Sequence, residues 1–456
     1  MAISTAIKNC RVVGPDRIID AGIGIEGERI AFIGRDGDIP PAENVIDAGG
    51  NYVLPGLVDP HFHMGYPFDI PLAEALRRDS SAAVAGGVTT GIQNVRFSPA
   101  GPLAGARDLV AAFERNCFFD LGLNAVIAND ENIRDIPALL DFGMPAIKLL
   151  APYRGAEVVV GMAGIDDGVM YLAYKEMGRL AKEGYKVFAR THCESGELAQ
   201  KLKHEYVSMR EEPVFFNDAR PNIVEAQGMV QYIYMAWSVN CPIYVVHMSI
   251  REGPGIVTRF RQLGAVVMCE TCPQYLALNV DNCDRLLSKT IPPVRHKEDN
   301  EALWRAIADG VIDCVGSDNG ATSKTKKQSI LDGMPGITGP EIMLPVMLSE
   351  GVNKGRIALE KAVELCCYNP ARIYGIAPRK GVLDIGSDAD LVIVDMKKRV
   401  KVTNDILHNG VDYTVWEGFW LTGWPILTML RGNVVMREGE ILGKAGCGRY
   451  IPAKVR

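Results

Sequence analysis

The sequence predicts an α/β protein that combines a (β/α)8 TIM-type barrel with a small β-sandwich domain built from both chain termini. Two observations carry this prediction. From about residue 57 to 377, short apolar runs rich in β-branched residues alternate with helical patterns, as in parallel strands joined by helices. Both ends of the chain instead show short alternating segments separated by glycine-containing turns, a pattern typical of antiparallel hairpins.

These two patterns divide the 456 residues into two units. Residues 1–56 and 378–456 are expected to form the β-sandwich domain with a C-terminal extension, and residues 57–377 are expected to form the barrel. Near the N-terminus, "IDAGIGIEGERIAFIG" (19–34) predicts a hairpin. Near the C-terminus, "DADLVIVDM" and "MLRGNVVMREGEILG" predict strands with a turn at 437–440. The chain is longer than one ordinary core, which agrees with more than one unit.

The central region contains eight strand candidates with helical segments between them. Helices are predicted at 166–184, 220–239 and 298–310, and Gly184 and Gly310 mark the ends of the first and the last. Eight strands that alternate with helices fit a closed barrel. The strand candidates are "YVLPGLVDP" (52–60), "TTGIQNV" (89–95), "LGLNAVI" (121–127), "AIKLL" (146–150), "KVFARTH" (186–192), "IYVVHMS" (243–249), "AVVMCE" (265–270) and "IDCVGSD" (312–318).

Composition and charge exclude several classes of function. A net charge of −6 without a basic tail gives no electrostatic footprint for nucleic acid or for a membrane surface. Apolar stretches fall short of a membrane span, and the first residues lack the order of a secretory signal. The eleven cysteines are expected to be reduced thiols, because the count is odd and the chain is long. We therefore expect a cytoplasmic protein without nucleic-acid or membrane partners.

Potential metal ligands gather where the strand patterns end, which is where barrels of this kind carry their chemistry. Four of the seven histidines occupy such positions, whereas His204, His296 and His408 lie in polar contexts and are expected at the surface. Histidines two residues apart on a strand project from the same face, so one such pair can reach a single ion. The residues at the strand ends are His61, His63, Lys148, His192, His247 and Asp318.

A series of short motifs runs along nearly the whole chain. It begins with "PGLVDPHFHMGYPF" (55–68) and ends with "GRYIP" (448–452). Between these two segments lie "AGGVTT", "YVVHMS", "ETCPQYL", "PPVR", "GSDNGAT" and "NPARIYGIAPRKGVLDIGSDADLVIVD". Each motif alone is weak, but the ordered set resembles the cyclic-amidohydrolase branch of the amidohydrolase superfamily, and most of all its hydantoinases and dihydropyrimidinases.

The resemblance implies a centre of two divalent metal ions, most often Zn2+. In relatives with these motifs, the pair that matches His61 and His63 holds the more buried ion together with the aspartate that matches Asp318. The histidines that match His192 and His247 hold the other ion. The resemblance also implies hydrolysis of a small cyclic amide, of hydantoin or dihydropyrimidine type, to an N-carbamoyl amino acid. A hydroxide that bridges the two ions would attack the ring carbonyl, and Asp318 would move the proton to the departing nitrogen.

Other site residues follow from the same resemblance. Lys148 matches a lysine that reacts with carbon dioxide and becomes N6-carboxylated, so that its carbamate bridges the two ions. A buried lysine has a lowered pKa, which suits reaction as a neutral amine. Tyr153 lies five residues later, at the position of a tyrosine that stabilises the developing oxyanion. The backbone near Ile291 and the residue that matches Thr338 would bind the amide edge of the ring.

Three positions depart from the family pattern. Gly65 stands where dihydroorotases usually have an arginine that binds the substrate carboxylate, so a neutral ring is favoured. Asn319 follows Asp318 where relatives often have histidine, and Ile291 replaces a serine common in hydantoinases, which predicts a more apolar pocket. The alternatives are an allantoinase or a dihydroorotase-like enzyme, a mononuclear deaminase, and a non-catalytic dihydropyrimidinase-related assembly protein. Retention of all six candidate ligands argues against the last of these.

Some further expectations concern the surroundings of the site. The segments 64–70 and 151–162 are expected to shape substrate choice. The segment 320–339 predicts a loop near the mouth of the pocket, and its lysines, Lys327 among them, are expected on a solvated face, although they could attract an anion. Because the family is commonly tetrameric, the resemblance implies a homotetramer.

Overall fold

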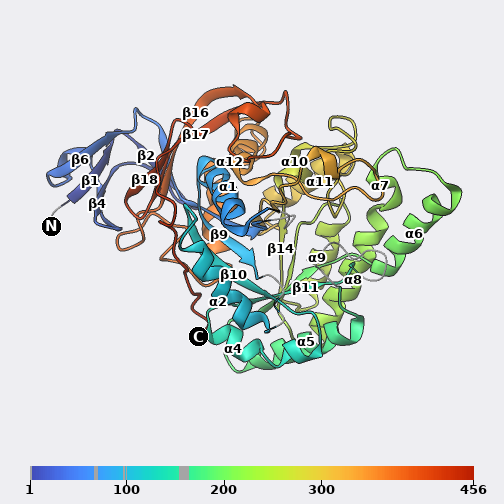
Figure 1. Cartoon of the computed structure of the whole chain (residues 1–456). Coiled ribbons are helices and arrows are strands. Elements are labelled where there is room, and N and C mark those ends of the chain that lie inside the picture. Colours follow the sequence, from blue (N-terminus) through green and yellow to red (C-terminus); the bar gives the residue numbers. More distant parts are fainter. Residues whose placement is uncertain (1–2, 66–69, 96–97, 99, 154–163) are drawn as a thin grey trace.

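The computed structural model describes residues 3–65, 70–95, 98, 100–153 and 164–456. A barrel of eight parallel strands with helices around it forms the larger part of the molecule, and two smaller sheets lie to one side of it (Figure 1). The seven-stranded sheet contains strands from both ends of the chain, which are blue and red in Figure 1. The predicted fold class is therefore confirmed.

The barrel strands are hydrogen-bonded in chain order, and all of their pairings are parallel. The first strand approaches the last at a parallel bridge between Phe62 and Asn319. This bridge brings the carboxyl ends of the two strands together, although they are far apart in the sequence. The strands are β8 (Leu57–Phe62), β9 (Val88–Asn94), β10 (Asp120–Val126), β11 (Ala146–Leu150), β12 (Phe188–His192), β13 (Ile243–Val245), β14 (Val267–Thr271) and β15 (Cys314–Val315).

Helices surround the barrel (Figure 1). Two of those predicted end as expected, since Gly184 and Gly310 follow them with φ angles of +88° and +73°, which glycine adopts readily. Among the helices of the described segments, none combines the length and the apolar character that crossing a bilayer requires. The helices are α1 (Leu72–Ala85), α2 (Pro102–Phe113), α3 (Asp130–Ile133), α4 (Ile136–Asp141), α5 (Asp167–Lys182), α6 (Gly196–Met209), α7 (Phe216–Ala219), α8 (Asn222–Ser238), α9 (Gly253–Gln262), α10 (Pro273–Ala277), α11 (Lys297–Ala308), α12 (Pro340–Val346), α13 (Leu359–Val363) and α14 (Asn369–Ile373), with short 3-10 or π segments η1 (Asp36–Asp38), η3 (Lys324–Lys326), η4 (Met347–Val352), η5 (Glu364–Tyr368) and η6 (Asn404–Ile406).

The two smaller sheets have the strand orders β5-β4-β1-β6 and β19-β18-β17-β16-β7-β2-β3. Both predicted hairpins are present: β4 pairs with β5, and β18 pairs with β19 with Arg437 opposite Glu440. An apolar cluster between these sheets combines residues from both chain ends, for example Ile23 and Leu391. The strands are β1 (Ile3–Lys8), β2 (Arg11–Val13), β3 (Ile18–Asp20), β4 (Gly22–Glu26), β5 (Arg29–Gly34), β6 (Ala42–Asp47), β7 (Tyr52–Pro55), β16 (Leu391–Lys401), β17 (Trp420–Leu430), β18 (Asn433–Arg437) and β19 (Glu440–Ile441).

The single strand predicted over 52–60 is two strands in the structure. β7 pairs with β16 in the seven-stranded sheet, whereas β8 pairs with β9 in the barrel. The chain passes from one sheet to the other at Gly56, where a Cβ atom would lie 2.2 Å from the hydroxyl oxygen of Thr89. The close approach therefore requires glycine. The prediction was wrong on this point, although the dipeptide of Pro55 and Gly56 within the run is a signal for a break in a strand.

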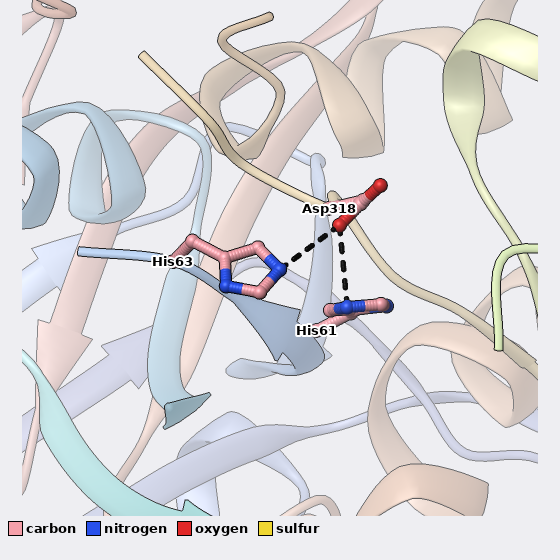
Figure 2. Close-up of side chains that lie close together, drawn as sticks. All are labelled: His61, His63 and Asp318. Atoms are coloured by element: carbon pink, nitrogen blue, oxygen red, sulfur yellow. Dashed lines mark ion pairs between the residues drawn. The ribbon is translucent and has the colours of Figure 1, made fainter. Parts of the chain in front are cut away.

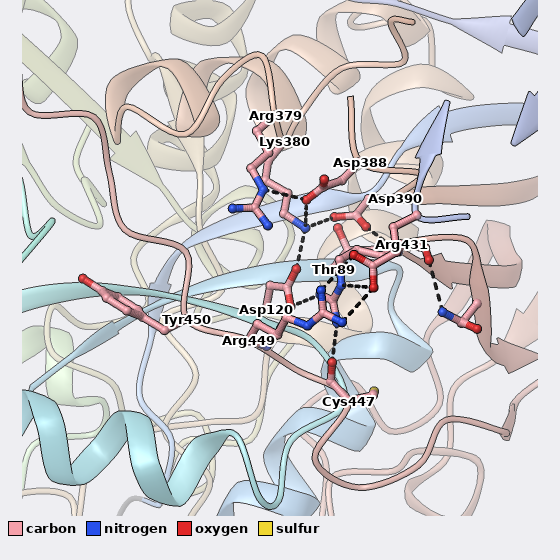
Figure 3. Close-up of polar contacts among 12 residues, drawn as sticks. Thr89, Asp120, Arg379, Lys380, Asp388, Asp390, Arg431, Cys447, Arg449 and Tyr450 are labelled. Atoms are coloured by element: carbon pink, nitrogen blue, oxygen red, sulfur yellow. Dashed lines mark hydrogen bonds and ion pairs between the residues drawn. The ribbon is translucent and has the colours of Figure 1, made fainter. Parts of the chain in front are cut away.

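A buried cluster of charged side chains joins the barrel to the C-terminal part of the chain (Figure 3). Asp120 begins β10, at the end of the barrel opposite the carboxyl ends of the strands. The Nζ atom of Lys380 lies 2.5 Å, 2.9 Å and 2.6 Å from carboxylate oxygens of Asp120, Asp388 and Asp390. Arg431 also forms an ion pair with Asp120. The three carboxylates are close enough together to hold a cation, and the Lys380 ammonium group lies among them.

Candidate metal centre

The predicted site residues meet in one pocket at the carboxyl ends of the barrel strands. Its lining contains all six candidate metal ligands, together with Tyr153 and Ile291. The ligands come from the ends of β8, β11 and β12 and from the segments that follow β13 and β15. The described lining residues are His61, His63, Lys148, Leu150, Tyr153, His192, His247, Thr290, Ile291, Asp318, Gly320, Pro335 and Gly336.

His61, His63 and Asp318 form a compact group at the junction of β8 with the segment after β15. The Oδ1 atom of Asp318 lies 3.2 Å from Nε2 of each histidine, and Figure 2 shows the carboxylate facing both imidazoles. Burial lowers the pKa of both histidines, which favours neutral rings with a free nitrogen lone pair. Burial alone would raise the pKa of Asp318, but the hydrogen bond with His63 and the charges around it hold this pKa well below its usual value.

His192 and His247 form the second pair of imidazoles. The Nδ1 atom of His192 lies 3.1 Å from Nε2 of His247, and the ring of His247 stacks on that of His61 at a centroid distance of 5.3 Å. Burial lowers the pKa of both residues. Tyr153 packs its ring edge-on against His192 at 5.4 Å. The second pair is therefore continuous with the first group and with the predicted oxyanion-stabilising tyrosine.

Lys148, near the end of β11, is buried between these groups, with 2% of its surface exposed. Burial, followed by the positive charge of Arg190, lowers the pKa of its amine to about 7. A substantial share of the side chain is therefore neutral near neutral pH, and a neutral amine is the form that reacts with carbon dioxide.

Two buried glutamates hold histidines of this site from behind. Glu270 Oε1 contacts Nδ1 of His61, and Glu194 Oε2 lies 2.5 Å from Nε2 of His192. Arg220 pairs with Glu194 at 2.7 Å. A carboxylate on one ring nitrogen fixes the orientation of an imidazole and leaves the other nitrogen for a metal. The residues that hold the ligands are thus part of the site.

Sequence reasoning missed both glutamates, although each carried a usable signal. Glu270 ends the predicted strand "AVVMCE", and the neighbouring strand ends on either side carry candidate ligands. Glu194 lies two residues after His192, just beyond the predicted strand "KVFARTH". A search for a second carboxylate behind each histidine would have found them.

The two predicted substrate-binding residues lie in different places. Ile291 lines the pocket. Thr338 is not among the described lining residues; its hydroxyl group accepts a hydrogen bond from Asn409 at 3.4 Å, while Pro335 and Gly336 line the pocket instead. Parts of the segments expected to shape substrate choice, 66–69 and 154–162, lie outside the described residues.

The residues that depart from the family pattern have clear local roles. Gly65 has a φ angle of +71°, which side chains other than glycine rarely adopt, and its amide donates a hydrogen bond to Asp79 at 2.8 Å. Asn319 donates through its side-chain amide to the carbonyl of His63 at 3.3 Å. Asn319 therefore ties the segment after β15 to the metal-binding end of β8.

One expectation about the loop 320–339 is wrong. Lys324 is exposed, as predicted, but Lys327 is buried with 2% of its surface exposed. Its amine donates to the backbone carbonyl of Lys289 and lies 6.0 Å from the ring centre of Tyr413. These contacts link segments far apart in the sequence, which the local basic composition of the loop could not reveal.

The described residues fit divalent metal ions. The buried Nε2 atom of His61, which lies 3.2 Å from Oδ1 of Asp318, makes no hydrogen bond within the described part of the chain, and buried polar atoms normally have a partner. Potential ligand atoms of His61, His63 and Asp318 all lie within 4.8 Å of one another. Neutral imidazoles combined with a carboxylate suit zinc and similar ions.

Comparisons with known proteins agree with this chemistry. Residues 247–435 match the amidohydrolase family. The chain is 32% identical to the L-hydantoinase of Paenarthrobacter aurescens, covering 98% of this chain and 97% of that protein, and 32% identical to the D-hydantoinase of Ralstonia pickettii, with 98% of each covered. The chain belongs to the amidohydrolase family, in its cyclic-amidohydrolase branch.

The structure of this amidohydrolase also resembles solved members of that branch. The dihydropyrimidinase of Brevibacillus agri superimposes with a TM-score of 0.90 at 27% identity, and 99% of both chains are covered. The similarity thus includes the terminal sheets as well as the barrel. Divalent metal binding is typical of the family, and the cluster of His61, His63 and Asp318 supplies candidate ligands for it.

Proposed function

We propose that this amidohydrolase hydrolyses the ring amide of a small neutral cyclic amide, of hydantoin or dihydropyrimidine type, to an N-carbamoyl amino acid. The observation that carries the proposal is the convergence of all six candidate ligands and Tyr153 on one pocket. The likeness to hydantoinases of both D and L type supports the same class of substrate. Gly65, in the position where an arginine would bind a substrate carboxylate, favours an uncharged ring.

Two divalent ions, most simply zinc, are proposed for the site. His61, His63 and Asp318 would hold one ion, and His192 and His247 the other. Such ions, when bound, lower the pKa of a coordinated water and polarise a carbonyl group. The imidazoles are suited to this role because burial keeps them neutral.

Lys148 is proposed to be N6-carboxylated. Its neutral amine would attack carbon dioxide, a nitrogen–carbon bond would form, and one proton would leave, which produces a carbamate anion. This anion would offer two oxygen atoms between the two groups of ligands and would neutralise part of the charge of the ions. The lowered pKa of Lys148, which results first from burial, supports the reaction. Assembly of the centre would consequently require carbon dioxide or bicarbonate.

Asp318 and Tyr153 are the proposed catalytic residues. The carboxylate of Asp318 stays ionised, because its pKa is held well below the usual value, and it would accept a proton from the attacking water. It would then deliver this proton to the ring nitrogen as the carbon–nitrogen bond breaks. The hydroxyl group of Tyr153 would donate a hydrogen bond to the oxygen that becomes negative during the attack.

The ring itself would bind by its amide edge to the backbone near Ile291 and, by the family resemblance, to Thr338. We also propose the division into a barrel of residues 57–377 and a β-sandwich domain of residues 1–56 and 378–456. A homotetramer is proposed from the family resemblance alone.

Ring opening by protein loaded with zinc in the presence of bicarbonate tests the proposed function. The panel should contain hydantoin, a bulky 5-substituted hydantoin, dihydrouracil, allantoin and dihydroorotate. We expect turnover of the hydantoins or dihydrouracil and none of dihydroorotate. If two metal ions are bound and no compound of the panel is turned over, the substrate would be another cyclic amide. If the protein binds no metal and turns over no compound, the mechanism is refuted.

A further inference from the structure

Two buried lysines lie behind the wall of the pocket, away from the candidate metal ligands. Lys289 and Lys327 are 5% and 2% exposed. They belong to different loops, since Lys289 follows β14 and α10 whereas Lys327 follows β15. Burial, followed by the charge of Lys289, lowers the pKa of Lys327 well below its usual value. Burying an amine costs free energy unless the amine is hydrogen-bonded.

The two amines connect the loops through backbone carbonyls. Lys327 Nζ donates to the carbonyl oxygen of Lys289 at 3.0 Å, and Lys289 Nζ donates in the opposite direction to the carbonyl oxygen of Leu331 at 2.9 Å. The amide of Gly336 also donates to the carbonyl oxygen of Lys289, at 3.0 Å. A carbonyl oxygen has two lone pairs, so this one is fully used by Lys327 and Gly336.

These contacts bear directly on the pocket. The carbonyl of Lys289 belongs to the same planar peptide unit as the amide of Thr290, so fixing one fixes the direction of the other. Thr290 and Ile291 line the pocket from the first loop, and Pro335 and Gly336 line it from the second. The hydrogen bonds of the two lysines thus join two walls of the pocket from behind.

We propose that Lys327 and Lys289 are positioning residues that hold these two pocket walls at the spacing that a cyclic amide requires. The inference rests on the proposed function, because it assigns the walls to substrate. The lysines do not touch the metal ligands and act through Thr290, Ile291 and Gly336. Their loss is expected to affect substrate binding far more than metal binding or the chemical step.

The test compares three variants of the full chain: Lys327→Met, Lys289→Met and, as a control, Lys324→Met. Methionine keeps a long apolar side chain and removes the donor, and Lys324 is an exposed lysine of the same loop. The measurements are bound zinc, kcat and KM for the ring that the wild type opens best. We expect KM to rise about threefold to tenfold in the first two variants, the factor that corresponds to one lost hydrogen bond, with kcat and bound zinc unchanged.

Hydrogen exchange of peptides that cover 288–292 and 333–337 gives a readout independent of turnover. Faster exchange in Lys327→Met, but not in Lys324→Met, is expected. An unchanged KM together with a lower melting temperature would mean that the lysines serve stability alone, and the proposal would be wrong. If the wild type opens no ring, the proposed function fails, and the exchange measurement still decides whether the lysines hold the two walls. If Lys327→Met does not fold, Lys289→Met decides by the same measurements.

Discussion

Replacing Lys380 by methionine should separate the stability of this protein from its metal chemistry. The Lys380 ammonium group is 1% exposed and lies within 3 Å of carboxylates of Asp120, Asp388 and Asp390. Burial alone would lower its pKa, but these three carboxylates raise it above the usual value. The lysine therefore stays charged and balances negative charges that are themselves buried.

The expected loss can be worked out from what remains after the substitution. Asp120 keeps its ion pair with Arg431, and Asp388 keeps Arg29 and Arg379. Asp390 keeps a hydrogen bond from the backbone amide of Arg431 and the longer-range attraction of the Arg431 guanidinium group. The buried Asp390 carboxylate thus loses its direct ion pair with Lys380, and removing one partner of a buried pair typically costs about 3 to 5 kcal/mol of unfolding free energy.

The assay is urea unfolding of Lys380→Met against Lys354→Met as a control. Lys354 pairs with Glu350 at 2.5 Å but is half exposed, and such a surface pair contributes about 0 to 1 kcal/mol.

Burial raises the pKa of Asp390. Without the ammonium group, this carboxyl group destabilises the fold while ionised, so the loss of unfolding free energy in Lys380→Met should shrink as the pH falls through the raised folded pKa toward the unfolded pKa of about 4. The reasoning would be refuted if Lys380→Met and Lys354→Met lost the same unfolding free energy. It would also be refuted if the loss in Lys380→Met grew as the pH falls.

Lys148→Ala is expected to lose bound metal and turnover while keeping its secondary structure by circular dichroism; full metal content in this variant would exclude the carbamate. Glu194→Gln removes the charge behind His192, so zinc affinity measured by chelator competition should fall about 10- to 100-fold, and an unchanged affinity would contradict the role of this glutamate. The hydrogen bond with Glu341 raises the pKa of His408, so the stability from this histidine is fully present below its unfolded pKa of about 6.5 and is lost as the pH rises through the folded value. His408→Ala should therefore lower the unfolding free energy more at about pH 6 than at about pH 9, and a loss independent of pH would count against the pair.

The candidate ligands could be predicted from the sequence because consecutive strands of the barrel are also neighbours in space. The carboxyl ends of all its strands meet on one face, so a strand pattern that ends in histidine, lysine or aspartate already places that side chain. His192 and Asp318 are separated by more than a hundred residues in the chain, yet they line the same pocket. The resemblance to a family then supplied their grouping, which spacing alone left open.

The residues that the sequence did not reveal act across loops or across sheets. Lys327 stands in a polar, turn-rich segment whose composition is typical of a solvated loop, and only the tertiary fold buries it against Lys289. The chain changes sheets at Gly56, and the side chain of Thr89, whose approach requires glycine there, is distant in the sequence. Local patterns report which face of an element is apolar, but they do not report which neighbour covers it.

The Lys380 cluster and the candidate metal centre lie at opposite ends of the barrel strands, and this separation makes the predictions about stability and about metal binding distinguishable. Asp120 begins β10, whereas Asp318 and the four candidate histidines lie at or beyond the carboxyl ends of their strands, and Lys148, within β11, lines the same pocket. A substitution at the Lys380 cluster can alter metal binding only if its structural effect is transmitted along the barrel strands. Loss of stability with full metal content would indicate a rigid barrel between the two ends, whereas simultaneous loss of metal would indicate that the β-sandwich side of the protein helps to hold the strand ends in place.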